Sequence, residues 1–260
     1  MRRLYLSVLV VAGLAALASG HMLFAVYPED VAEHSDVNIW ITYAHDIEGD
    51  TPPMLERAAL IRPDGTEGLS LSEWDGGLAG TVMVGGPGCY VLDLEMEPTF
   101  LDLGWFGITG GSTFLPKSGR AVMPVGAGGD CEISTGKGLE IVPQVDMSGI
   151  VRGDRFRASA FWYGEMVEGD YTAMVVKAPE DLLTVLHAYE SEVDGTSSDG
   201  TIEFDLSKPG LWVVSFEATI DKSGTWTATT DDPSGRYRKG DRLDYDQIAP
   251  TAYLTFWCGR

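Results

Sequence analysis

The chain has 260 residues, of which 39 are acidic and 18 are basic, and its formal net charge is −21. This charge argues against nucleic acid or anionic lipid as a partner, because both need a basic surface on the protein. Acidity of this kind also serves solubility, and it attracts cations only weakly. The length is sufficient to bury the core of one large domain or of two smaller ones.

The first twenty residues have the pattern of an export signal. Two arginines precede an apolar stretch, Leu4–Leu17, which is shorter than the ~20 residues that a membrane span needs. Ala18 and Gly20 provide the small residues that a signal peptidase requires, so that the mature chain would begin at His21. We therefore expect an exported protein, in the periplasm, outside the cell or on its surface. The alternative is a signal segment that is retained as an anchor.

The rest of the chain has the pattern of a β protein. Apolar and polar residues alternate in short segments with turn residues between them, and a Gly-rich break at 126–130 divides these segments into two groups. Strands are predicted at 37–43, 58–61, 81–84, 89–94, 139–143, 155–162, 171–176, 201–206, 211–218, 225–229 and 252–257. Residues 179–187 fit either one helical turn or a strand. The prediction is an all-β fold of two consecutive β-sandwich domains, residues 21–130 and residues 131–260, the second Ig- or fibronectin-like.

Three cysteines, Cys89, Cys131 and Cys258, are compatible with an oxidising compartment. They allow one disulfide with three possible pairings, and one thiol remains over. A disulfide through Cys258 would tie the last strand to the body of the protein. No C-x-x-C spacing occurs, so a metal site built from cysteines is not expected.

A metal site is instead predicted at His21. An N-terminal histidine offers two nitrogens to one ion, its α-amine and its imidazole, and a second histidine completes a three-nitrogen site that suits copper or nickel. His45 follows a predicted strand and is the second expected ligand. Asp46 beside it can orient that imidazole by accepting its other N–H, as carboxylates around metal sites do.

Other candidate ligands have weaker arguments. His187 lies in an apolar context, which suits a packed or surface histidine, although it could complete a site between the two domains. His34 is expected to be a solvated loop residue. Met22 and Met54 lie near the two favoured histidines in sequence, and thioethers suit Cu(I), but methionine in a β protein more often fills the core.

Three central motifs carry a resemblance to a known family: Ala121–Gly126, then Gly138–Gln144, then Gly153-Asp154. With them the chain resembles the DUF4198 family over nearly all of its mature length. The flanking matches are His21, Tyr43–Asp46, Asp199-Gly200, Pro209–Trp212 and Tyr253–Phe256. The resemblance implies a periplasmic protein associated with nickel or cobalt uptake.

The favoured function is therefore an exported protein that binds nickel, cobalt or copper and supplies or buffers the metal for a membrane transporter. No G-x-S-x-G, H-E-x-x-H or phosphate-binding Gly loop occurs, so we expect no enzymatic activity. Two alternatives remain. One is a non-catalytic adhesion or ligand-binding module that presents the aromatic residues Trp74, Trp105, Phe106 and Trp226. The other is a copper oxygenase that holds its metal between an N-terminal histidine and a second histidine.

Overall fold

The computed structural model describes residues 22–44, 52–74, 76–126, 130–176 and 191–259. In the first part of the chain the strands are β1 (Met22–Val26), β2 (Ser35–Ala44), β3 (Leu55–Arg62), β4 (Gly65–Gly68), β5 (Ser72–Trp74), β6 (Gly77–Val84), β7 (Gly88–Met96), β8 (Thr99–Asp102), β9 (Ser112–Leu115) and β10 (Lys117–Val125). In the second part they are β11 (Leu139–Pro143), β12 (Arg155–Trp162), β13 (Glu165–Met166), β14 (Gly169–Val176), β15 (Ser191–Ser197), β16 (Thr201–Asp205), β17 (Gly210–Glu217), β18 (Gly224–Thr227), β19 (Arg242–Tyr245), β20 (Gln247–Ile248) and β21 (Thr251–Cys258). The predicted all-β class is confirmed, since the described residues form strands and two short 3₁₀ turns but no α-helix.

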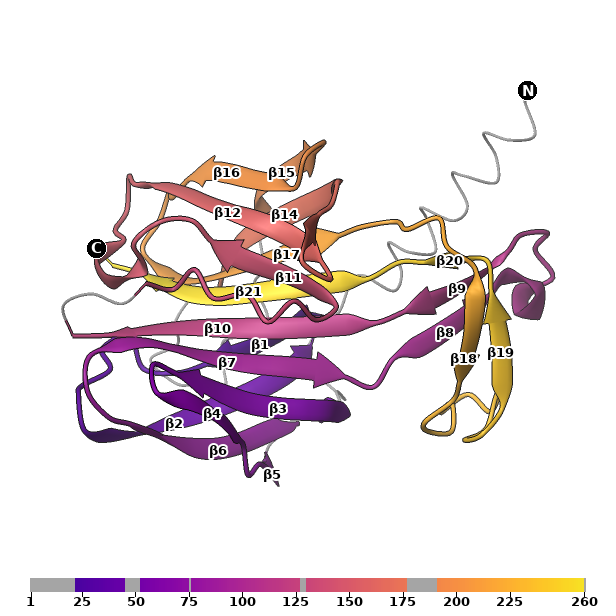
Figure 1. Ribbon diagram of the computed structural model, residues 1–260, viewed down its shortest axis with the longest axis horizontal. Helices are drawn as coiled ribbons and strands as arrows, with labels where there is room; N and C mark the ends of the chain where they lie inside the picture. The colour runs from indigo at the N-terminus through magenta and orange to yellow at the C-terminus, as the bar shows by residue number, and fades with distance from the viewer. Residues whose placement is uncertain (1–21, 45–51, 75, 127–129, 177–190, 260) are drawn as a thin grey trace.

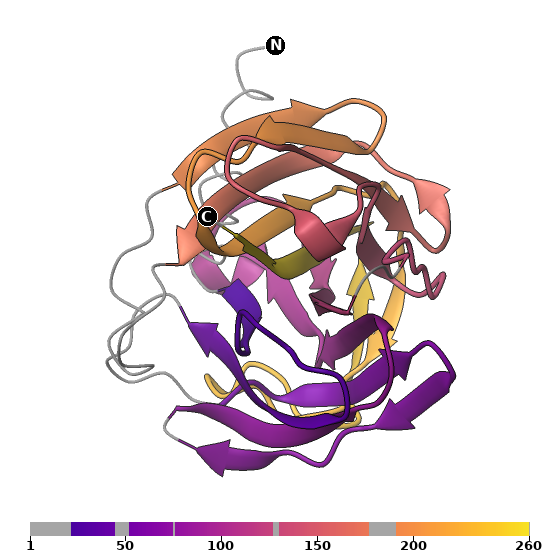
Figure 2. The ribbon, with the colours of Figure 1, turned by 90° about the vertical axis from the view of Figure 1, so that its left-hand side faces the viewer.

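Three sheets form the layers of the protein (Figures 1 and 2). The central sheet has eight strands in the order β15-β14-β17-β21-β10-β7-β3-β4. The N-terminal sheet, in the order β1-β2-β6-β5, packs on one face, and the cover sheet, formed by β11, β12, β13 and β16, packs on the other. The hairpin β18–β19 and the small sheet β20-β9-β8 extend to one end, at the right of Figure 1.

The central sheet combines strands from both sides of residue 130. Strand β21 pairs in parallel with β10 and antiparallel with β17, so it joins β14, β15 and β17 to β3, β4, β7 and β10. The predicted domain boundary between residues 130 and 131 stays a prediction. The topology adds that the parts on either side of it share one continuous sheet.

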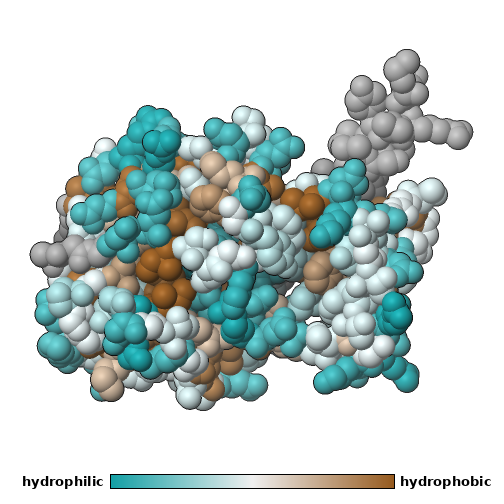
Figure 3. Space-filling view, in the orientation of Figure 1, coloured by the Kyte–Doolittle hydropathy of each residue, from teal (hydrophilic) through white to brown (hydrophobic). Residues whose placement is uncertain are grey.

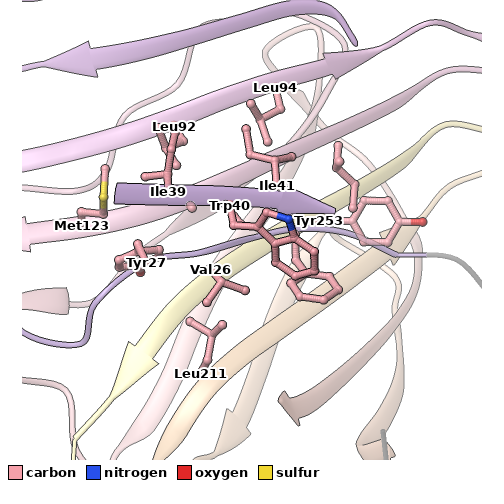
Figure 4. Close-up of a cluster of buried hydrophobic side chains, with 14 of the residues drawn as sticks. Val26, Tyr27, Ile39, Trp40, Ile41, Leu92, Leu94, Met123, Leu211 and Tyr253 are labelled. Atoms are coloured by element: carbon pink, nitrogen blue, oxygen red, sulfur yellow. The ribbon is translucent and has the colours of Figure 1, made fainter. Parts of the chain in front are cut away.

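The first core lies between the central sheet and the N-terminal sheet (Figure 4). It is built from alternate residues of these strands together with β1, whose five residues are all buried. The side chains labelled in Figure 4 are Val26, Tyr27, Ile39, Trp40, Ile41, Leu92, Leu94, Met123, Leu211 and Tyr253. Because β1 is buried on both faces, it has no alternation of apolar and polar residues.

The second core lies between the central sheet and the cover sheet. Its aromatic centre includes Phe156 and Phe256, whose rings stack 4.7 Å apart with an angle of 7° between their planes. The free cysteine, Cys258, is buried in this core and forms no disulfide, so the expected role of Cys258 in tying down the last strand is wrong. Burial raises the pKa of its thiol to about 11. Strand β21 is held instead by strand pairing on both of its sides.

The disulfide joins Cys89 to Cys131, 42 positions apart. Cys89 pairs with Pro124 near one end of the ladder between β7 and β10, and both cysteines contribute to the second core. A double substitution of these cysteines by alanine should lower the free energy of unfolding by roughly 4 kcal/mol, because a closed loop of this length restricts the unfolded chain. Urea denaturation with and without reductant measures the effect. Reductant should destabilise the wild type but not the double variant, and equal behaviour of the two would contradict the prediction.

A buried ionic network links the central sheet to the cover sheet. The Arg120 guanidinium on β10 bonds to the Glu140 carboxylate on β11 at 2.5 Å and to the Asp93 carboxylate on β7 at 3.3 Å. All three side chains are at most 6% exposed. Burial acts to raise the pKa of Glu140, but Arg120 and the hydroxyls of Ser134 and Thr135 outweigh it and hold that pKa below its usual value. The network therefore favours the ionised form of Glu140 between the central sheet and the cover sheet.

The end of the molecule that carries β18–β19 has a third, aromatic core. Trp105 and Trp226 pack there around Phe100 and Tyr237, with ring centroids 5.4–6.4 Å apart. The expectation that Trp105 and Trp226 are presented to a partner is therefore wrong, because both rings are half-buried in this core. Trp74 and Phe106 are exposed as expected. The face of the molecule that Figure 3 shows has mostly hydrophilic and neutral residues, and its hydrophobic residues gather between the layers.

Candidate metal centre at the start of β1

The four predicted metal-site residues, His21, His45, Asp46 and His187, lie outside the described residues. The structure does describe the residues next to two of them. Met22 pairs with Ala44 at the end of the antiparallel ladder between β1 and β2. The Cα atoms of such a pair lie about 4.5–5.5 Å apart. The chain thus reaches residues 21 and 45 from two directly paired positions.

Strand β1 lies along β10 and β21 of the central sheet. Gly119 on β10 is so close that a Cβ atom there would come within 2.8 Å of the Leu23 side chain. Further along, the Tyr27 hydroxyl donates a hydrogen bond to the Val122 carbonyl at 2.5 Å, and the Trp257 indole N–H donates to the Tyr27 carbonyl at 2.9 Å. Strand β1 therefore runs in the direction of β10, and its first residue lies toward Lys117.

A row of polar residues crosses the central sheet at that end. Asp170 on β14 pairs with Glu217 on β17, Glu217 pairs with Thr251 on β21, and Thr251 pairs with Lys117 on β10. Neighbouring strands are about 4.8 Å apart, so the row brings together side chains from four strands. The Lys117 ammonium donates a hydrogen bond to the Tyr43 hydroxyl, which links the row to β2 of the N-terminal sheet.

The environment at this end of the sheet raises the pKa of Glu217 and of the neighbouring Tyr253. Burial raises the pKa of Glu217, and the nearby Asp170 carboxylate adds to the effect while Lys117 opposes it. Burial also raises the pKa of Tyr253 well above its ordinary value, with smaller contributions from Tyr43 and Glu217. The Tyr253 phenol consequently stays protonated at neutral pH. The site offers a carboxylate, two phenol oxygens and one ammonium group beside the start of β1.

Sequence reasoning missed Lys117, Glu217 and Tyr253. They come from three strands that are distant in the chain, and although Tyr253 stands in a segment that matches the family, none of the three has a spacing that indicates a shared site. Only the register of the central sheet places them together. The signal that could have found them is the strand pairing of β10 with β21, which the sequence alone does not provide.

The remaining sequence candidates lie elsewhere or in other roles. Val176 and Ser191, which flank the segment that contains His187, lie toward the Leu211 end of the central sheet, opposite to Lys117. His34 is an exposed turn residue with φ 55°, as expected for a solvated loop position. Met22 is buried in the first core, whereas Met54 is 49% exposed. Among the residues that the structure describes, no group of three or more His, Cys, Asp or Glu side chains is arranged to hold a metal ion.

The arrangement defines an all-β protein with a polar cluster at one end of its first strand. The profile of a family described as "Domain of unknown function (DUF4198)" matches residues 18–220, and the chain belongs to this family. No curated protein sequence matches the chain. Within the described residues, no helix is long and apolar enough to cross a membrane.

Solved structures show distant likeness. The fibronectin(III)-like modules of CbhA from Clostridium thermocellum are 12% identical, with 92% of this chain and 94% of that chain covered and a TM-score of 0.23. An alpha-2-macroglobulin from Escherichia coli is 12% identical (91% and 15% covered, TM-score 0.27). One from Salmonella is 11% identical (92% and 16% covered, TM-score 0.25). The chain thus spans less than a fifth of either macroglobulin, and TM-scores this low do not define a shared overall fold.

Proposed function

We propose that this protein is exported, binds nickel, cobalt or copper through His21 and His45, and supplies or buffers the metal for a membrane transporter. The observation that carries the proposal is the pairing of Met22 with Ala44. His21 precedes Met22 in the chain and His45 follows Ala44, so the two histidines adjoin this pair of facing positions. Two histidines at paired positions are close enough to share one ion.

The donor set determines the class of metal. Cleavage after Gly20 would give His21 a free α-amine, so that His21 supplies two nitrogens and His45 a third. Imidazole and amine nitrogens favour copper and nickel over magnesium or calcium, which prefer oxygen ligands. Three nitrogen ligands from the protein leave at least one coordination position of the metal open. An open position lets a second protein take the metal by ligand exchange, which suits delivery.

The polar row beside β1 supports the same assignment. The Glu217 carboxyl group and the Tyr43 and Tyr253 phenols supply oxygen atoms that can bind a metal-held water. Lys117 partly neutralises this cluster in the absence of metal. In this proposal the metal is the cargo of the protein, and these described residues shape the surroundings of the nitrogen ligands.

The test combines the mass of the exported protein with a metal titration. We expect a mature chain that begins at His21 and binds one Cu²⁺ with nitrogen couplings in its EPR spectrum, and His34→Ala should behave as wild type. A mature chain that retains residues before His21, or one that binds no metal tightly, would overturn the proposal. Reductant-dependent cleavage of a polymer by the copper-loaded protein would show a copper oxygenase instead.

A further inference from the structure

A groove of about 690 Å³ lies between strands β1, β2, β5 and β6 of the N-terminal sheet and Trp257 of β21, away from the polar row at the start of β1. Its floor is one row of paired residues: Ser72 on β5, Ala79 on β6, Trp40 on β2 and Val26 on β1. The small side chain of Ala79 lies between Ser72 and Trp40 in this row and leaves space above it. Figure 4 shows Trp40, Val26 and Tyr27 at this part of the sheet. The volume falls within the range of about 300–1,000 Å³ that is usual for sites of small ligands.

Three tryptophans form the floor and sides of the groove: Trp40, Trp74 and Trp257. The Trp40 indole N–H donates to the Trp74 carbonyl at 3.3 Å, and the two rings meet edge to face at 6.5 Å. Gly77 permits this arrangement, because a Cβ atom there would come within 2.4 Å of the Trp40 Nε1. The Trp257 indole N–H is bonded to the Tyr27 carbonyl. Both N–H groups are thus engaged within the protein, and Trp40 is only 6% exposed, so it supports the wall of the groove more than it contacts a ligand.

Trp74 is the exposed member of the three, with 47% of its surface accessible. Beside the tryptophans the groove has a few neutral polar groups, on Asn38, Ser72 and Thr81. The Thr81 hydroxyl donates to the Asn38 carbonyl oxygen at 3.0 Å, which fixes the Asn38 amide with its NH₂ group as a donor. The groove therefore joins aromatic surface to fixed amide and hydroxyl groups.

None of the twelve lining residues is charged, although the chain has 39 acidic residues. A cationic ligand would find no counter-charge in the groove, and an anionic one would be repelled by the net charge of the protein. An extended peptide that adds a strand needs an unpaired strand edge, and β2 and β6 in the middle of the floor are paired on both sides, which leaves only the edge strands β1 and β5 at its sides. The ligand that fits is neutral, with apolar faces and hydroxyl edges, and a sugar ring has this combination.

We propose that this groove binds a short stretch of a neutral polysaccharide, with Trp74 as the stacking surface and Asn38 and Thr81 as hydrogen-bonding partners for sugar hydroxyls. The C–H face of a pyranose ring packs against the electron-rich face of an aromatic ring. The site is separate from the proposed metal centre and does not depend on it.

The test uses the mature full chain with hexasaccharides of β-1,4-glucose, β-1,4-xylose, β-1,4-mannose and α-1,4-glucose, followed by calorimetry and tryptophan fluorescence. At least one series should bind at millimolar concentration or below, and Trp74→Ala should weaken it roughly three- to tenfold. Trp74→Phe should retain most of the affinity. The matched control is Phe106→Ala, which removes an equally exposed aromatic ring at the other end of the molecule and should bind as wild type.

Three results would overturn the proposal. They are no binding of any neutral hexasaccharide, equal loss in Trp74→Ala and Phe106→Ala, or equally tight binding of a hexamer of galacturonic acid. Thermal unfolding of each variant establishes that it is folded, and Trp74→Ala should keep the copper affinity of the wild type. Failure of saccharide binding with intact copper binding would reject this inference alone.

Discussion

Replacement of His21 by alanine is expected to weaken Cu²⁺ binding by about 100-fold or more. The variant keeps an α-amine but loses the imidazole that chelates with it, and loss of outer-shell partners alone costs roughly 10- to 100-fold in metal affinity. Competition with a chelator of known affinity measures the change, and EPR reports the lost nitrogen coupling. His34→Ala removes a histidine from an exposed turn and is the matched control.

A one-residue glycine extension before His21 separates the two donors of this residue. The extended chain keeps the imidazole but moves the free α-amine away from it, so a site that requires both nitrogens should again lose most of its affinity. Undiminished binding in the extended chain would show that the α-amine is not a ligand. Undiminished binding in both variants would remove His21 from the site altogether.

Replacement of Arg120 by methionine is expected to lower the free energy of unfolding by about 3–5 kcal/mol. The variant leaves the Glu140 carboxylate buried without its cation, while Asp93 keeps its ion pair with Arg57 at 2.7 Å. Arg155→Met is the matched control, because Arg155 pairs with Glu203 at the surface, where such pairs contribute about 0–1 kcal/mol. Urea denaturation of the three proteins gives the comparison, and equal losses in the two variants would contradict the prediction.

The loss of unfolding free energy caused by Arg120→Met is expected to depend on pH in one direction. The pKa of Glu140 is lower in the folded protein than in the unfolded chain, so its contribution to stability is full at neutral pH. That contribution is lost as the pH falls below the unfolded value and through the folded one. The loss of unfolding free energy in Arg120→Met should therefore be largest at neutral pH. It should become progressively smaller in acid, once Glu140 is protonated. A loss of unfolding free energy that does not change with pH would indicate instead that the variant loses the packing of the aliphatic part of the Arg120 side chain.

Local pattern was sufficient to predict many of the strands. Alternation placed β11 and β12 at the bounds that the structure has, and it located β21 to within one residue at each end. Strand β1 was not predicted because all of its residues are buried, which removes the alternation. The short strands β5, β13 and β20 have too few residues to show any period.

The candidate site was less accessible to sequence reasoning. Position in the chain singled out His21, and no structural knowledge was needed for that. The cluster of Lys117, Glu217 and Tyr253 depends on strands whose pairing is non-local, and nothing in the local sequence specifies that pairing. The same is true of the groove, where Trp257 of the last strand lies beside Trp40 and Trp74 of the N-terminal sheet. Aromatic content drew attention to Trp74 but could not distinguish it from the half-buried Trp105 and Trp226.

The central place of β21 has a consequence for the timing of folding. Lys117 on β10 pairs with Thr251 on β21, 134 positions further along the chain, and β21 also provides the partner of β17. The eight-stranded sheet is thus split into two halves until this late strand is synthesised and inserted. Non-local pairing of this kind slows folding, because a long loop must close before its contacts form. The complete central sheet therefore forms only after β21 is available, whereas the pairings within each half, such as β3 with β7 and β7 with β10, can form earlier.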